Sequence, residues 1–136
     1  MKQQTRPAMY RAGDELPPLA KTITQEQIGR YADASGDHNP LHTDPEFAAT
    51  TQFGGTVAHG MLVLAYLSEM LTVAFGERWI AGGWMKARFR APARPGDTVT
   101  ASGRVTRVDD GTVRCDAECR NQAGEVLISA DVEAPA

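Results

Sequence analysis

Cysteine is scarce in this chain, which contains only Cys115 and Cys119 among its 136 residues. On a single strand the two side chains would point the same way but lie roughly 13 Å apart at ~3.3 Å per residue, too far for a mutual disulfide. We therefore expect both to be small core residues. Neither a disulfide framework, a metal site nor a cofactor is predicted.

A basic cluster is also missing, and so is a long apolar run. The chain has 14 Lys and Arg against 17 Asp and Glu, a net charge of −3, so no nucleic-acid partner is expected. The run from Met61 to Phe75 is interrupted by Ser68, Glu69 and Thr72 and is shorter than the ~20 residues that a membrane span needs. The polar residues 1–8 lack a secretory signal, so no membrane association is expected and a cytoplasmic location is the default expectation.

The length predicts one domain with a proper core but little room for a catalytic cleft of its own. We therefore expect a partner subunit, in a homodimer, to complete the site. Residues 1–14 are expected to be a loosely held lead-in, residues 15–133 the domain, and residues 134–136 a short tail.

The most complete helix signal starts at Thr24. Thr24 and Gln27 have the spacing of a capping box, and Ile23 can pack on Ile28 as a hydrophobic staple. Gly36 is suited to end this helix in a left-handed conformation. The following residues, from Asp37 onwards, are then expected to form a connector.

That connector carries the candidate chemistry. Ser35 to Thr43 reads S-G-D-H-N-P-L-H-T, with Asp37 and His42 close together. Pro40 is expected to prevent a helical continuation. Asp44, followed by a proline, predicts a short helix that ends at Ala49. A connector held by a helix at each end favours a preorganised pair of proton-transfer groups.

The rest of the pattern predicts an α+β fold. Residues 59–75 are apolar on nearly every face, which predicts a long helix wrapped by other structure and ended by Gly76. Residues 16–23 predict a first strand. Later strands are predicted at residues 84–91, 98–108, 112–121 and 125–132, forming an antiparallel sheet around the helix. Alternation places these residues inward: Met85, Ala87, Phe89, Ala91, Val113, Cys115, Ala117, Cys119, Val126, Ile128, Ala130 and Val132.

Three groups form the candidate catalytic set. Asp37 offers a carboxylate, His42 an imidazole, and Gly60 a backbone N–H at the start of the long helix. A proton-transfer pair beside an oxyanion donor is suited to adding or removing water next to a carbonyl. The apolar helix residues Leu62, Val63 and Tyr66 are expected to line an apolar substrate pocket.

Two longer motifs carry a family resemblance. Tyr31 to Ala48 reads Y-A-D-A-S-G-D-H-N-P-L-H-T-D-P-E-F-A, and Phe53 to Met61 reads F-G-G-T-V-A-H-G-M. The chain resembles the MaoC-like, (R)-specific enoyl-CoA hydratases at both segments, and its later pattern is similar to that family's hot-dog fold. The resemblance implies a dimer that binds acyl-CoA in a tunnel near the subunit interface.

The same resemblance assigns roles to individual residues. It implies that Asp37 and His42 form the catalytic pair, that Asn39 supports the loop, and that the Gly60 N–H binds the thioester oxygen. Substrate contact is also a hypothesis for Asn39 and for His59. The implied reaction is reversible hydration of trans-2-enoyl-CoA to (R)-3-hydroxyacyl-CoA, without a cofactor.

Plainer interpretations remain open at this point. Asp37 is also typical of a loop Asx turn, and His59 of a helix-start residue. Two other functions are possible for a hot-dog protein. The first is thioester hydrolysis, for which Glu69 is the sole acid on the long helix. The second is a non-catalytic subunit that completes a partner's site.

Overall fold

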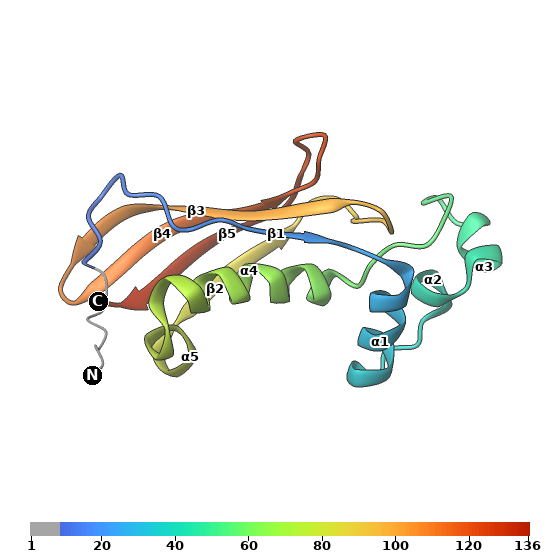
Figure 1. Cartoon of the computed structure of the whole chain (residues 1–136), viewed down its shortest axis with the longest axis horizontal. Helices are drawn as coiled ribbons and strands as arrows, with labels where there is room; N and C mark the ends of the chain where they lie inside the picture. Colours follow the sequence, from blue (N-terminus) through green and yellow to red (C-terminus); the bar gives the residue numbers. More distant parts are fainter. Residues whose placement is uncertain (1–8) are drawn as a thin grey trace.

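The computed structural model describes residues 9–136, which form a curved antiparallel sheet with one long helix against it (Figure 1). Three short helices lie together beyond one end of the sheet. The elements in chain order are β1 (Leu19–Thr22), α1 (Gln25–Ser35), α2 (Pro40–Thr43), α3 (Pro45–Ala49), α4 (Gly60–Phe75), α5 (Glu77–Gly82), β2 (Trp84–Phe89), β3 (Thr98–Asp109), β4 (Thr112–Arg120) and β5 (Val126–Pro135).

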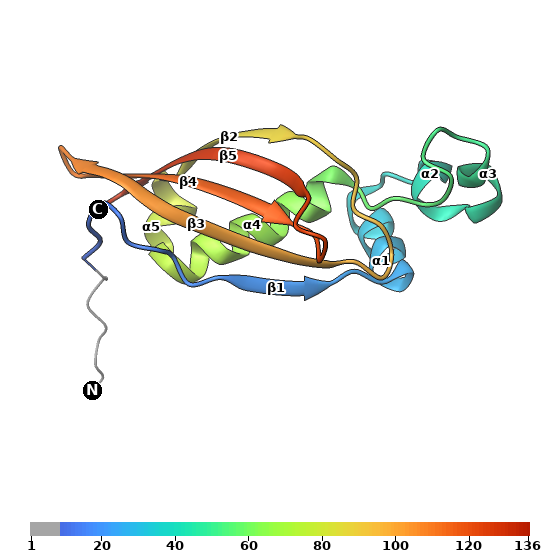
Figure 2. The ribbon, with the colours of Figure 1, turned by 90° about the horizontal axis from the view of Figure 1, so that it is seen from above.

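The five strands pair in the order β1-β3-β4-β5-β2, and every pair is antiparallel. Strands β1 and β2 are therefore the two edges, with the longer β3, β4 and β5 between them (Figure 2). The connector between β3 and β4 is the tight hairpin that Asp109-Asp110-Gly111 predicts; Asp110 and Gly111 both have positive φ. Together, the sheet and helices confirm the predicted α+β class.

The core lies between the sheet and α4. On the sheet side, Val113, Cys115, Ala117 and Cys119 of β4 are all buried, as their alternation predicts. On the helix side, the buried residues are Leu62, Val63, Tyr66, Leu67, Met70, Leu71, Ala74 and Phe75.

The sheet wraps α4 as expected, but one side of the helix stays partly exposed in the single chain. Met61 is 56% exposed and Val73 is 63% exposed, because the sheet covers only one side of the helix. Phe89 also departs from the expected inward pattern. It is 56% exposed because it lies at the end of β2, where its ring packs beside Gly60 at the start of α4.

Helix α1 is built as its sequence predicts. The Thr24 hydroxyl accepts a hydrogen bond from the Gln27 N–H, and the Gln27 side chain accepts one from the Thr24 N–H, so the capping box is complete. Gly36 ends the helix with φ of 79°, in the left-handed region that glycine tolerates. Asp37 is thereby the first residue after the helix.

Two helices were not predicted. Residues 40–43 form the single turn α2, although Pro40 was expected to keep this segment non-helical. Proline is compatible with the first helical position, and the Asn39 side chain caps the turn by accepting a hydrogen bond from the Leu41 N–H. Helix α5 follows directly on Gly76, which ends α4 but also precedes the next helix.

The two ends of the domain are held more firmly than expected. Within the described part of the lead-in, the Tyr10 hydroxyl donates to the Ala74 carbonyl at 3.1 Å, and Gly13 donates to Val105. Residues 1–8 lie outside the described residues. At the other end, residues 134 and 135 continue β5, and the Ala136 N–H donates to the Gly111 carbonyl. The predicted tail is therefore largely part of the sheet, because β4 offers it a pairing partner.

Among residues 9–136, none of the helices combines the length and apolar character that crossing a membrane requires.

Candidate active site

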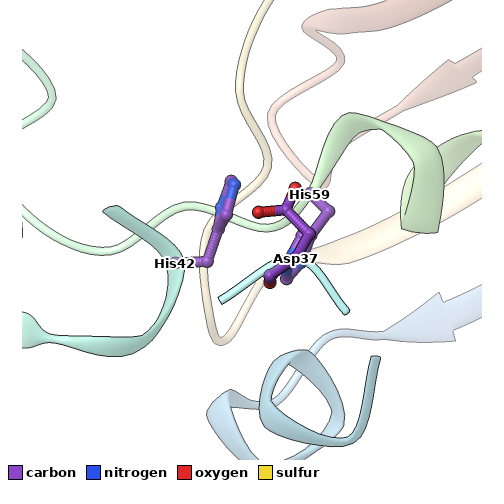
Figure 3. Close-up of side chains that lie close together, drawn as sticks. All are labelled: Asp37, His42 and His59. Atoms are coloured by element: carbon purple, nitrogen blue, oxygen red, sulfur yellow. The ribbon is translucent and has the colours of Figure 1, made fainter. Parts of the chain in front are cut away.

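Three side chains from separate segments meet where α1, α2 and the start of α4 come together. Asp37 follows α1, His42 lies on α2, and His59 immediately precedes α4 (Figure 3). One ligand-type atom from each of them lies within 4.8 Å of the others. The sequence thus brings Asp37 and His42 together as predicted.

The Asp37 side chain is exposed but anchored. One carboxylate oxygen, Oδ1, accepts a hydrogen bond from the Asn39 N–H at 3.2 Å, and the Asp37 N–H donates to the Ser35 hydroxyl. The Asx turn is therefore real and does not compete with a chemical role, because Oδ2 has no partner among the described residues. The Asn39 side chain in turn accepts a hydrogen bond from the Leu41 N–H, a structural contact that fits its expected support role.

His42 is half-buried and has a defined tautomer. Its Nδ1 lies 2.8 Å from the main-chain carbonyl oxygen of Val57. A carbonyl can only accept, so Nδ1 carries the proton and Nε2 has a free lone pair. The main chain of His42 is held as well, since its carbonyl accepts from Gln25 at 2.8 Å while Gln25 accepts from the Thr56 hydroxyl at 2.7 Å.

His59 is the only buried polar or charged residue in the described part of the chain, with 3% of its surface exposed. Its Nε2 lies 3.0 Å from the main-chain carbonyl of Asp37. Its ring stacks on that of His42 with a centroid separation of 3.8 Å and an interplanar angle of 24°. On another side the Tyr31 ring packs at 4.8 Å. His59 thus contacts both candidate catalytic residues.

Gly60 is the first residue of α4, so its N–H has no acceptor within the helix. It has no acceptor elsewhere in residues 9–136 either. A β-carbon at this position would lie 3.0 Å from two ring carbons of Phe89. The absence of a side chain at Gly60 therefore makes room for the Phe89 ring.

Gly60 lies between two pockets. The first, of about 250 Å³, is lined by Asp37, His42, His59 and Gly60 among others. The second, of about 280 Å³, is mainly apolar and includes Val63, Phe89 and Gly60. Gly60, at the N-terminus of α4, thus lines both the pocket that contains Asp37 and His42 and the apolar pocket.

The predicted acyl-pocket residues separate into two groups. Val63 lines the apolar pocket. Leu62 and Tyr66 line neither pocket beside Gly60 and are packed in the core, where the Tyr66 hydroxyl donates to Gln27 at 3.3 Å. Burial raises the pKa of Tyr66, in keeping with a neutral core residue.

The Asp37, His42 and His59 cluster has residue types that metals bind, but its geometry does not favour an ion. Two imidazoles on one metal direct their lone pairs to a common point. Here the rings are stacked nearly parallel, and Nδ1 of His42 is engaged by Val57. We therefore interpret the cluster as a proton-transfer site.

Sequence reasoning did not assign Gln25, Tyr31 or Phe89 to the site. Tyr31 begins the first of the two motifs but was given no role there, although its ring contacts the His59 ring. Gln25 gave no signal, because a glutamine in the first turn of a helix is common. The strand alternation detected Phe89, but alternation cannot show that its ring extends past the sheet to Gly60.

Comparisons with known proteins identify the family of this chain. A family model described as "MaoC like domain" matches residues 11–126. The chain belongs to the MaoC-like family.

Two named relatives match a large part of the chain. The chain is 44% identical over 100 residues to 3-hydroxyacyl-thioester dehydratase Z of Mycobacterium tuberculosis, covering 68% of this chain and 66% of that one. It is 41% identical over 92 residues to the (R)-specific enoyl-CoA hydratase of Rhodospirillum rubrum, covering 65% and 61%. The chain thus spans slightly less than two thirds of the length of these relatives.

The MaoC-like chain also resembles the unliganded R-hydratase PhaJ1 from Pseudomonas aeruginosa. The two are 30% identical with a TM-score of 0.82, and the match covers 93% of this chain and 82% of the other. This likeness confirms the expected hot-dog fold.

Proposed function

We propose that this MaoC-like protein catalyses the reversible hydration of trans-2-enoyl-CoA to (R)-3-hydroxyacyl-CoA. One observation carries the proposal: the Asp37 carboxylate and the His42 imidazole converge within 4.8 Å, beside a pocket that the free Gly60 amide also lines. The names of the relatives, a 3-hydroxyacyl-thioester dehydratase and an (R)-specific enoyl-CoA hydratase, support hydration and dehydration as the reaction class.

The paired groups can activate one water molecule. The free Nε2 of His42 and the free Oδ2 of Asp37 are both acceptors, so together they can orient a water and withdraw its proton. The water oxygen adds to the β-carbon of the enoyl thioester, and the proton is delivered to the α-carbon. In the reverse direction the same groups remove the α-proton and protonate the departing hydroxyl. No redox partner is required.

The thioester oxygen becomes negatively charged during this reaction, as the enolate forms. The Gly60 N–H, at the N-terminus of the 16-residue helix α4, is a donor for this oxygen. Its hydrogen bond to the oxygen would be stronger once bound substrate excludes water from the site. The apolar pocket next to it, lined by Val63 and Phe89, is where we place the acyl chain. Roles in substrate binding for Asn39, Leu62 and Tyr66 remain predictions.

Thioester hydrolysis is the less favoured alternative. It requires an acid near the thioester carbon, and Glu69 is the only one on α4. Glu69 is paired with Lys21 at 3.2 Å and lies nine residues after Gly60, about 13 Å along the helix at 1.5 Å per residue. It is therefore displaced from the oxyanion donor it would have to serve.

We further propose that the protein works as a homodimer. Strand β2 is an edge of the sheet, and edge strands with apolar side chains favour pairing. Trp84 and Phe89 on β2, Ile80 on the preceding α5 and Val73 on α4 are 50–72% exposed. A second copy covering them would also enlarge the cleft available to an acyl-CoA.

The test supplies purified protein with crotonyl-CoA and with a longer enoyl-CoA. Loss of enoyl absorbance and release of free thiol are followed together, and the hydroxyacyl product is resolved by chiral chromatography. We expect loss of absorbance, no thiol and an (R) product. Thiol release without a hydroxyacyl product would support thioester hydrolysis instead, and no reaction with either substrate would support the non-catalytic subunit. An (S) product would contradict the stereochemical assignment.

A further inference from the structure

His59 occupies the N-cap position of α4 but does not act as a helix cap. Serine, threonine, aspartate and asparagine are preferred at this position because their side chains bind the free amides of the first turn. The His59 side chain makes no such bond. It turns instead toward the preceding connector, so the position is used for something other than helix stability.

The contact it makes there is with the backbone of Asp37. Because the Asp37 carbonyl can only accept, the His59 Nε2 must be the donor in this 3.0 Å bond. The bond joins residues 22 positions apart and fixes the point at which the chain leaves α1. The direction of the Asp37 carboxylate depends on the backbone at this point.

The second contact is the stack on His42. At 3.8 Å between centroids, the His59 ring covers one face of the His42 ring and prevents it from tilting to that side. Val57 holds the edge of the same ring through Nδ1. One buried side chain therefore restrains both members of the proton-transfer pair.

The arrangement also carries a stability cost. His59 Nδ1 is fully buried and has no hydrogen-bond partner in residues 9–136. A buried acceptor without a partner is destabilising, and an apolar ring of similar shape would avoid the cost. A residue chosen only for packing would not need either nitrogen at this position.

We propose that His59 is a positioning residue for the hydration reaction: its Nε2–H holds the Asp37 backbone while its ring holds the plane of His42. This inference rests on the proposed function for its catalytic effect. It replaces direct substrate binding as the role of His59, since the side chain is 3% exposed and its donor is already engaged by the protein.

Two substitutions separate the donor from the ring. His59→Phe keeps a flat ring against His42 but removes the donor. His59→Gln keeps an N–H at a comparable reach but removes the ring. We expect His59→Phe to lower kcat by about 10-fold to 100-fold, the range that a misplaced catalytic group costs, with KM within about twofold of wild type. The Tm of His59→Phe should equal or exceed that of wild type. The kcat of His59→Gln should be clearly higher than that of His59→Phe.

A measurement that does not depend on turnover accompanies the kinetics. Ring ¹⁵N shifts of the wild-type protein should show His59 protonated at Nε2, and backbone ¹⁵N relaxation should show residues 37–41 less ordered in His59→Phe than in wild type or His59→Gln. If wild-type protein hydrates no enoyl-CoA, the proposed function fails, while the NMR result still decides the positioning role.

The inference is overturned by either of two outcomes. His59→Phe with unchanged kcat and an ordered connector would show that the donor does not position Asp37. Equal losses of kcat in both variants together with a lower Tm in both would show that His59 only packs the core.

Discussion

The Nδ1 of His42 donates a 2.8 Å hydrogen bond to the carbonyl of Val57, fifteen residues further along the chain. This bond fixes the histidine tautomer through the backbone, so it does not depend on the carboxylate of Asp37. The carboxylate is then free to share a substrate or a water with Nε2. This differs from sites in which the acid serves chiefly to orient the imidazole.

Replacing Asp37 by Asn or His42 by Ala should each reduce hydratase kcat by about 100-fold or more, the usual contribution of a general acid or base. Asp37 is exposed and His42 is half-buried, so circular dichroism and Tm should stay near wild type. The double variant should lose little more than either single variant, because both groups act on one water. Retention of more than about a tenth of kcat in either single variant would contradict the assignment.

Gly60→Val should reduce kcat more than it raises KM, because the amide acts mainly on the transition state. Gly60→Ala is a smaller change of the same kind. Its β-carbon would still meet the Phe89 ring at 3.0 Å. Adding Phe89→Ala removes that collision. We expect the pair Gly60→Ala/Phe89→Ala to recover activity relative to Gly60→Ala alone, measured as kcat on crotonyl-CoA. No recovery would show that the ring contact is not what limits the substitution.

Gln25→Ala should lower kcat as well as the free energy of unfolding. It leaves the Thr56 hydroxyl and the His42 carbonyl without their partner, which costs about 1–3 kcal/mol of unfolding free energy. Gln27→Ala is the matched control on the same helix, because it disrupts the capping box and the Tyr66 bond instead. Urea unfolding and kcat should show similar stability losses in both but a loss of kcat only in Gln25→Ala.

The cysteines should be unreactive in the folded protein. Burial raises the pKa of Cys115 to about 11 and that of Cys119 to about 12. At pH 8 about a thousandth or less of either thiol is ionised, so reaction with a disulfide reagent should require unfolding. Rapid modification of native protein would contradict their placement in the core.

The same shifts predict a loss of stability at alkaline pH. A thiol with a raised folded pKa contributes stability that is complete below the unfolded value near 9 and is lost as pH rises toward 11 and 12. Urea unfolding at pH 8 and pH 10.5 measures the loss. Cys115→Ala/Cys119→Ala should show a smaller loss, with a remainder because burial also raises the pKa of Tyr10 and Tyr66.

The dimer is testable by mass. Light scattering should give about twice the chain mass of 14.7 kDa. Ile80→Glu/Trp84→Glu places charges on two exposed side chains near β2 and should shift the protein toward monomer, with reduced hydration activity. A monomeric wild type with full activity would remove the need for a partner.

The sequence predicted local features better than relations between distant segments. The capping box at Thr24, the left-handed Gly36 and the alternation in β4 depend on neighbours within a few residues, and all are confirmed. The single turn at Pro40 was missed because one Asn side chain outside it provides the cap. The stacking of His59 on His42 has no local signature, since it depends on how α2 and α4 meet.

Gly60 is also a boundary between two separable parts of the protein. The candidate proton-transfer residues belong to the segment from α1 to the start of α4, whereas half of the residues that line the apolar pocket are Phe89, at the end of β2, and residues 90–93 of the connector after it. Under the proposed function, we therefore expect substitutions at Phe89 and its neighbours to change acyl selectivity without disturbing Asp37 and His42. An enzyme with that function would offer protein engineers a route to new acyl preferences with the original chemistry left in place.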